Sequence, residues 1–92
     1  MTKSDLIQTI SAETGISTTA VRRTLNEAMD IIAGSISRSE TVILPGFGTF
    51  GRKHRDSRIG RNPRTGEMIE LPACNVPVFK ASNWLKKTVN VG

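Results

Sequence analysis

The residues with the clearest chemical potential lie in one basic stretch, whose turn at residues 60–67 reads GRNPRTGE. Between positions 52 and 64 the only acid is Asp56, and the basic residues are Arg52, Lys53, Arg55, Arg58, Arg61 and Arg64. The remaining seven basic and seven acidic residues cancel, so this stretch carries the whole net charge of +5. Clustered cations of this kind favour a polyanionic partner over an ordinary solvated loop.

Other potentially reactive residues do not assemble into a catalytic or cofactor site. Residues 46–51 match the G-x-G-x-x-G dinucleotide fingerprint, which requires a helix to begin at its end. The segment that follows, RKHRDSRIG, has no helical periodicity, so the match fails. His54 and Cys74 are too few for a zinc site, and Cys74 is interpreted as a small buried or rim residue. We therefore predict no enzymatic activity, no cofactor and no bound metal.

Length and composition predict one small intracellular domain. A chain of 92 residues suits a single domain over 1–92, whose stability is marginal unless chains associate. One cysteine excludes an internal disulfide, and the opening MTKSDLIQTI lacks the features of a signal peptide. No apolar run is long enough to span a membrane, so a cytoplasmic location is expected.

Two helices are expected before the basic stretch. Thr2 and Asp5 form a potential capping box for the first helix, which should end at Gly15. Ser17 is a candidate cap for the second helix, whose apolar positions recur at helical spacing as Val21, Leu25, Ala28, Met29, Ile32 and Ile36. The short connection predicts an antiparallel helical hairpin.

Short strands should follow the two helices. Residues 41–44 are β-branched or apolar, Pro45-Gly46 turns the chain, and a strand starting near Gly48 continues into the basic stretch. Residues 67–71 read as its return strand. The strand pair at about 52–72 is too long and polar to pack on so small a body, so we expect a protruding, mobile arm.

The end of the chain completes an α+β fold. Pro72 should interrupt the return strand, residues 76–79 read as a short strand whose proline suggests an edge or a bulge, and Ser82 can cap a last helix. The prediction is a helical hairpin, a three-stranded antiparallel sheet with a long β-ribbon arm, and a short C-terminal helix. The few phenylalanines, Phe47, Phe50 and Phe79, suggest a core shared by two chains.

Several motifs together resemble one known family. They are MTKSDLI at the start, GFGTF at 46–50, HR at 54–55 with Arg58, GRNPRTGE at 60–67 and VPVFK at 76–80. Over essentially the whole chain, the sequence is similar to the bacterial HU / integration host factor family of histone-like DNA-binding proteins, and most similar to HU. The resemblance implies an intertwined homodimer whose two arms lie in the minor groove of double-stranded DNA. It also implies largely sequence-independent bending and compaction of nucleoid DNA.

The resemblance also implies roles for particular residues. A proline at the arm tip, here Pro63 beside Asn62, would wedge between base pairs. The expected DNA contacts are Arg52, Lys53, Arg55, Arg58, Arg61, Asn62, Pro63 and Arg64 in the arm, with Gly46, Gly48, Lys3, Lys80 and Lys86 in the body. The expected dimer core is Phe47, Phe50, Phe79, Leu44, Leu25, Met29 and Ile32. Asn83 and Trp84 depart from the usual pattern of the family, where a lysine often stands near this point.

Alternative functions remain open at the level of sequence. A sequence-preferring subunit of a heterodimer, like integration host factor, fits the same motifs. A helix-turn-helix reader is allowed by residues 14–17 and Arg22-Arg23, but it would leave the arm without a role. An acidic protein could also bind the arm, whereas neither helix has the basic face that a membrane surface requires.

Overall fold

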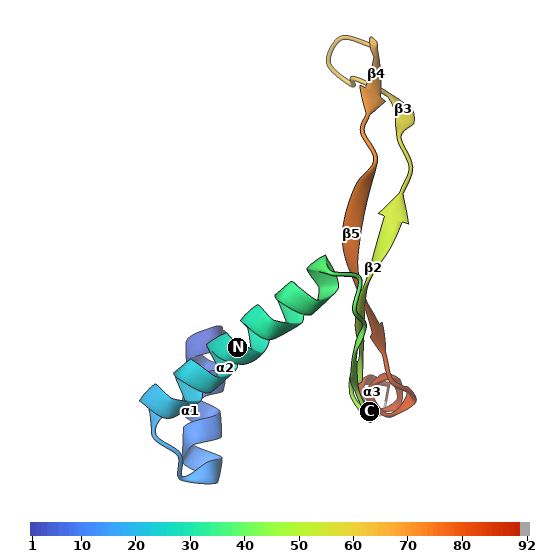
Figure 1. Ribbon diagram of the computed structural model, residues 1–92. Coiled ribbons are helices and arrows are strands. Elements are labelled where there is room, and N and C mark those ends of the chain that lie inside the picture. Colours follow the sequence, from blue (N-terminus) through green and yellow to red (C-terminus); the bar gives the residue numbers. More distant parts are fainter. Residues whose placement is uncertain (91–92) are drawn as a thin grey trace. The chain divides into compact units, whose positions relative to one another are not determined.

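The computed structural model describes residues 1–90 and confirms the predicted α+β class. Its elements are α1 (Lys3–Thr14), α2 (Thr18–Ser37), β1 (Val42–Leu44), β2 (Gly48–Arg55), β3 (Arg58–Arg61), β4 (Met68–Leu71), β5 (Cys74–Ala81) and α3 (Asn83–Val89) (Figure 1). They fall into two compact units, residues 1–34 and the part of the chain from Ser35 onward, which are described separately.

The two predicted helices of the hairpin begin where their capping residues stand. The hydroxyl of Thr2 accepts the amide of Asp5, and the Asp5 carboxylate accepts the amide of Thr2 at 3.0 Å. The hydrogen bond from the Thr2 backbone, and to a smaller extent the one from the Thr2 side chain, hold the pKa of the Asp5 carboxyl below its ordinary value. Their contribution to stability is therefore present above about pH 4 and is lost as the pH falls further. Ser17 caps α2 by accepting the amide of Ala20 at 3.2 Å.

The first unit contains few buried apolar side chains. Gly15 ends α1 in the left-handed conformation, with φ of 75°, as its position predicted. Ile7 and Val21 are buried, but Met29 is 44% exposed and Leu25 and Ile32 are only half-buried. The apolar stripe of α2 is thus present, although one chain leaves much of it uncovered.

Three antiparallel strands form the sheet of the second unit, in the order β1-β2-β5. A tight turn joins β1 to β2, in which the amide of Phe47 donates to the carbonyl of Leu44 at 2.9 Å. Pro45 and Gly46 occupy its central positions, and the φ of 83° at Gly46 is the conformation that a type II turn requires. Pro77 lies within β5, and β5 is an edge strand of this sheet, as its proline indicated.

A two-stranded ribbon continues from this sheet. β1 pairs with β2 only as far as Phe50, so residues 52–77, named the arm below, have no third strand (Figure 1). Arg55 pairs with Cys74 and Arg58 pairs with Leu71, so both strands skip two residues, 56–57 and 72–73. Because the gap is symmetric, the register is the same on both sides and the arm contains no bulge.

Two details of the arm differ from the expectation from sequence. The return path is longer, because β5 begins at Cys74 rather than near Val76 and pairs with the whole of β2. Pro72 does interrupt the return strand, as predicted, since it has no amide to donate. Cys74 is exposed, so of the two interpretations, buried or rim residue, the buried one was wrong; an alternating strand without a third layer leaves such a side chain in solvent.

The three phenylalanines meet on the sheet without being enclosed by one chain. The Phe50 and Phe79 ring centroids are 4.7 Å apart, and those of Phe47 and Phe79 are 5.6 Å apart. Phe47 and Phe79 are nevertheless 44% and 43% exposed. Gly48 lies under this group, because a Cβ added there would stand 2.5 Å from the Phe79 ring and 2.7 Å from the carbonyl oxygen of Lys80.

We expect Gly48→Ala to lower the free energy of unfolding by about 2 kcal/mol, because the added methyl group overpacks against a ring and against backbone. The measurement is urea unfolding at one fixed protein concentration. Gly51→Ala is the matched control in the same strand, since its Cβ would meet only Thr41 Oγ1, at 3.9 Å. Equal unfolding midpoints for the two variants would show that Phe79 moves aside at no cost.

Candidate nucleic-acid interface

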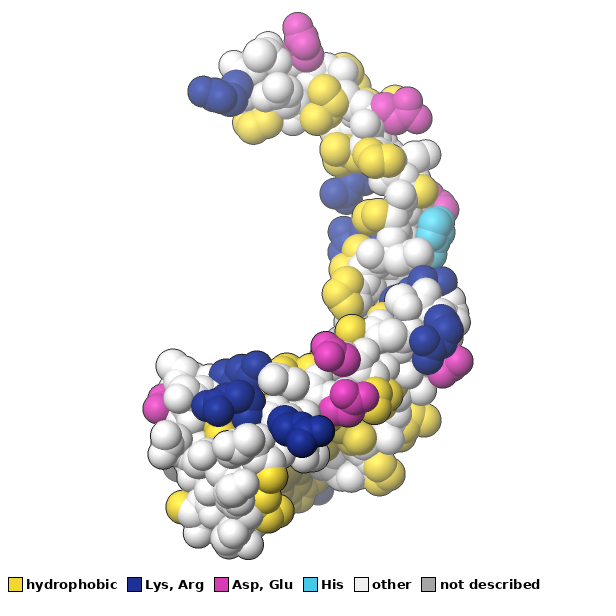
Figure 2. Space-filling view, turned by 60° about the vertical axis from the view of Figure 1, so that its left-hand side comes forward, with side chains coloured by type: hydrophobic (Ala, Val, Ile, Leu, Met, Phe, Trp, Pro, Cys, Tyr) yellow, Lys and Arg dark blue, Asp and Glu magenta, His cyan; other side chains and the backbone are white. Residues whose placement is uncertain are grey.

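The predicted cations of the arm are exposed and come from both of its strand pairs. Lys53 and Arg55 lie on one face of β2, because alternate residues of a strand share a face. In β3, Arg58 pairs with Leu71, and Arg61, three residues nearer the tip, pairs with Met68. Figure 2 shows Lys and Arg side chains spaced along the arm, with hydrophobic side chains between them.

Most of these cations have no partner in the part of the chain that the structure describes. Within residues 1–90, no hydrogen bond or ion pair is made by the side chains of Lys53, Arg55, Arg58, Arg61 and Arg64. Asp56, the acid that lies among these cations in the sequence, instead contacts His54, with Nε2 and Oδ1 3.2 Å apart. The other ring nitrogen of His54, Nδ1, is 3.2 Å from Oδ1 of Asn75 across the strand pair. The arginines are therefore left available for an external anion.

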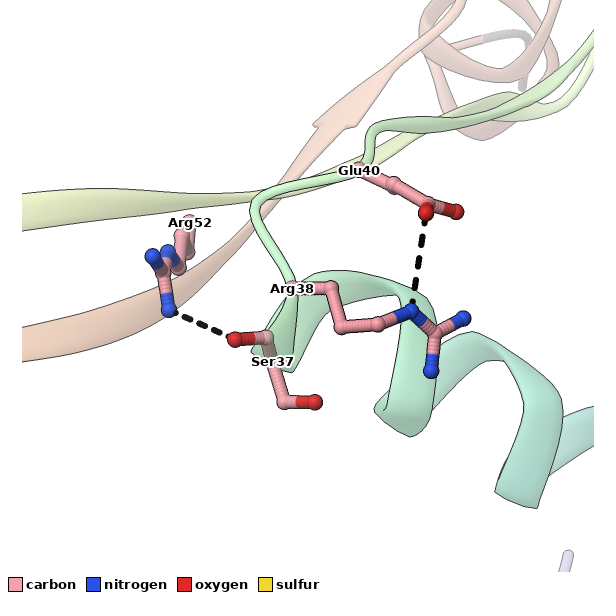
Figure 3. A network of polar contacts seen from close by, with 4 residues as sticks. All are labelled: Ser37, Arg38, Glu40 and Arg52. Atoms are coloured by element: carbon pink, nitrogen blue, oxygen red, sulfur yellow. Dashed lines mark hydrogen bonds and ion pairs between the residues drawn. The ribbon is translucent and has the colours of Figure 1, made fainter.

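Arg52 differs from the other basic residues of the arm. Its Nη1 donates to the carbonyl oxygen of Ser37 at 2.9 Å (Figure 3). Its Nη2 donates to the hydroxyl of Ser39. Nearby, Arg38 and Glu40 form an exposed ion pair at 3.5 Å. Sequence reasoning grouped Arg52 with the DNA contacts because a bond to a backbone carbonyl leaves no trace in residue types.

The arm tip is a small closed loop built on Asn62. Its amide donates to the carbonyl of Glu67 at 2.8 Å, and its carbonyl accepts the amide of Gly66 at 2.7 Å. Its side-chain Oδ1 accepts the amide of Arg64 at 2.9 Å, which encloses Pro63 in an Asx turn. Gly66 has φ of 75°, which suits glycine. The loop presents the ring of Pro63, which has no amide of its own, as an exposed apolar group.

A second group of predicted residues meets at the base of the sheet. A shallow hollow of about 420 Å³ is lined by Gly46, Gly48, Lys80, Asn83 and Lys86, among others. Ser82 organises it, because its hydroxyl donates to the carbonyl of Gly46 at 2.7 Å and accepts the amide of Leu85 at 3.1 Å. Sequence reasoning identified Ser82 only as a helix cap and missed this long-range bond. Lys3 belongs to α1 in the other unit.

The remaining sequence expectations concern sites of other kinds. In the part of the chain that the structure describes, no three His, Cys, Asp or Glu side chains gather as metal ligands would. None of the helices described is both long enough and apolar enough to cross a bilayer. Trp84 is 60% exposed on α3.

Comparison with known proteins identifies the class. Residues 1–90 match the family model described as bacterial DNA-binding protein. The chain is 41% identical to DNA-binding protein HU-beta of Pseudomonas aeruginosa over 90 residues, which cover 98% of this chain and 100% of the relative. It is also 41% identical to integration host factor subunit beta of Actinobacillus succinogenes, with 98% of this chain and 97% of the relative covered.

A solved structure gives the same result for the fold. The chain superposes on a chain of the Anabaena HU–DNA cocrystal structure with a TM-score of 0.94 and 32% identity, and the match covers 100% of both chains. HU from Thermotoga maritima, at 24% identity, shares the fold with a TM-score of 0.70. The chain belongs to the bacterial DNA-binding protein family that contains HU and integration host factor.

We expect Asn62→Ala to loosen the arm tip. Hydrogen exchange of the Arg64 amide should accelerate about fivefold, since one such hydrogen bond contributes roughly 1 kcal/mol. Amide exchange followed by NMR measures this in the free protein. Arg64→Ala is the control, because it keeps the backbone donor and removes a side chain that makes no internal bond. If both variants exchange alike, the Asx turn does not hold the tip.

Proposed function

We propose that this protein is a non-enzymatic DNA-bending protein that acts as a homodimer on double-stranded DNA, largely without regard to sequence. In the bacterial cytoplasm it would contribute to compaction and architecture of the nucleoid. The observation that carries the proposal is the arm itself: a ribbon with unpartnered arginines along it and an exposed proline at its tip. Membership of the family and the likeness to a chain solved with DNA support the choice of DNA as the polyanion.

The arm's arginines would hold the minor groove. A narrow minor groove concentrates negative potential, which attracts arginine without requiring a particular base. Arg55, Arg58 and Arg61 have no partner among the described residues to release before they bind, so their full charge is available. Ile59 and Met68 are 70% and 65% exposed beside them, and apolar groups this open on an arm suit contact with a partner surface. Lys53, Asn62 and Arg64 would complete the arm's contacts.

Pro63 would act as the wedge that bends the duplex. An apolar side chain inserted at a base step unstacks it, at a cost of a few kcal/mol, and kinks the helix. The bonds that close the loop on Asn62 keep the proline ring presented before DNA arrives, which reduces the ordering cost on binding.

The body would take up the DNA that the bend returns to it. Lys80 and Lys86 line one hollow with the backbone of Gly46, so a phosphate there would meet two cations at close range. Lys3 would add a contact from α1. Gly48 also lines the hollow. The close packing of Phe79 is enough to explain why this position has no side chain.

Two chains are proposed because one chain leaves its apolar side chains in water. Phe47, Phe79 and Leu44 on the sheet are 44%, 43% and 39% exposed, and Phe50 is half-buried beside them. Leu25, Met29 and Ile32 leave the stripe of α2 open in the same way. Exposure on this scale marks an association surface. A second copy with the same surface would form a shared core.

The salt dependence of binding tests the proposal. If a dimer neutralises about eight phosphates, log K should fall against log salt with a slope of about −7 on duplex DNA. The measurement is a titration of intact, nicked and single-stranded DNA, with sedimentation equilibrium to fix the stoichiometry. A slope near −2, or a monomer that binds as well, would contradict arms that engage the groove as a pair.

We expect Pro63→Ala to reduce the bend angle more than the affinity, because the arginines remain while the wedge is lost. Fluorescence energy transfer between the ends of a bound duplex measures the angle. Pro72→Ala, which changes a proline of the same arm away from the tip, should leave it unchanged. Identical transfer in the wild type and Pro63→Ala would remove the wedge from the mechanism.

A sequence-preferring subunit, comparable to integration host factor, is the second candidate. It is favoured by the equal identity, 41%, to an HU-beta and to an integration host factor beta subunit. Selection from random DNA separates the two functions, since a sharp consensus supports the second and a flat profile supports the first.

A further inference from the structure

Arg52 occupies the step at which the arm leaves the sheet. β1 pairs with β2 for the last time at Phe50, and from Gly51 onward β2 has only β5 beside it. A ribbon of two strands is marginally stable in water by itself. The root of the arm therefore needs some other restraint if the arm is to keep a direction.

The guanidinium of Arg52 supplies such a restraint. It reaches back to the corner between α2 and β1, where one nitrogen donates to the Ser37 carbonyl (Figure 3). A second nitrogen donates to the Ser39 hydroxyl. Ser37 is the last residue of α2, and a cation at this end is favoured by the helix dipole. Ser39, at the same corner, has φ of 64°, an uncommon conformation for serine.

The same bonds separate Arg52 from its neighbour Lys53. Both are basic and exposed, and they are consecutive in β2, so they point to opposite faces of the ribbon. Lys53 makes no side-chain hydrogen bond within residues 1–90, whereas Arg52 would have to give up two in order to contact a phosphate. The planar fork of arginine suits two acceptors at once, which a lysine could not match.

We propose that Arg52 is a positioning residue, a side-chain strut that fixes the root of the arm against Ser37 and Ser39, and not a DNA contact. The side chain of Arg52 restrains β2 at the point where β1 no longer pairs with it. It restricts the directions of the free arm, so less conformational freedom is lost when the arm enters the groove. The effect on DNA binding rests on the proposed function, but the restraint on the free arm does not.

Arm motion in the free protein tests the strut directly. Cys74, the single cysteine, is exposed in the arm and accepts a maleimide dye, whose time-resolved anisotropy reports the amplitude of arm motion. Arg52→Gln should increase this amplitude, and Lys53→Gln, which removes the same charge one residue away, should not. Equal amplitudes in these two variants would overturn the proposal.

A variant on the acceptor side guards against misfolding of Arg52→Gln. Ser39→Ala keeps the Cβ and the charge of the protein and removes only the hydroxyl acceptor. We expect it to increase the amplitude part of the way, and to add nothing in the double variant with Arg52→Gln. Additive effects in the double variant would mean that the two residues act independently, and the strut would be rejected.

DNA binding distinguishes a strut from a phosphate contact. Arg52→Gln should weaken binding roughly twofold to tenfold, the range expected for a modest ordering cost, with the salt slope unchanged. Lys53→Gln should make the slope shallower by about 2, since a dimer loses two phosphate contacts. A slope change of that size in Arg52→Gln would make Arg52 a phosphate contact. If the wild type shows no salt-dependent DNA binding, the proposed function fails, while the anisotropy still decides the role of Arg52.

Discussion

The pairing of β2 with β5 is the constraint on which the rest of the molecule depends. One register runs from Gly48 opposite Ala81 to Arg55 opposite Cys74, and it resumes unchanged in the pairing of β3 with β4. The inner end of this pairing places Phe50 against Phe79 and forms the sheet. The outer end carries the cations and the closed tip. A slip of one residue would exchange the faces of both ends together.

The two ends of the ribbon face opposite physical demands. Near Gly48 the backbone is packed so closely on Phe79 that a Cβ has no room, and Ser82 ties the Gly46 turn to the start of α3. Beyond Gly51 no third strand covers the pair, and solvent reaches both faces. Charged side chains suit such a surface, because they need no core and discourage pairing with another edge. The division between packed body and basic arm follows from where β1 ends.

Much of the molecule could be predicted from local signals. The capping box at Thr2 and the caps at Ser17 and Ser82 depend on residues within one turn of the chain, and the structure forms them as expected. The exposure of Cys74 and the full length of β5 could not be predicted. Both depend on how many strands lie beside a segment, and the residues of the segment itself do not indicate that number.

The amino-acid order by itself determined the helices, the Pro45-Gly46 turn, the proline-bearing basic arm and the family, because each rests on short-range chemistry or on a quoted motif. Tertiary structure alone decided which cations remain available. Arg52 and Lys53 are alike in sequence, yet folding gives one of them two acceptors fifteen and thirteen residues away and leaves the other in solvent. A hydrogen bond to a distant carbonyl requires only a backbone position, and residue type cannot encode it.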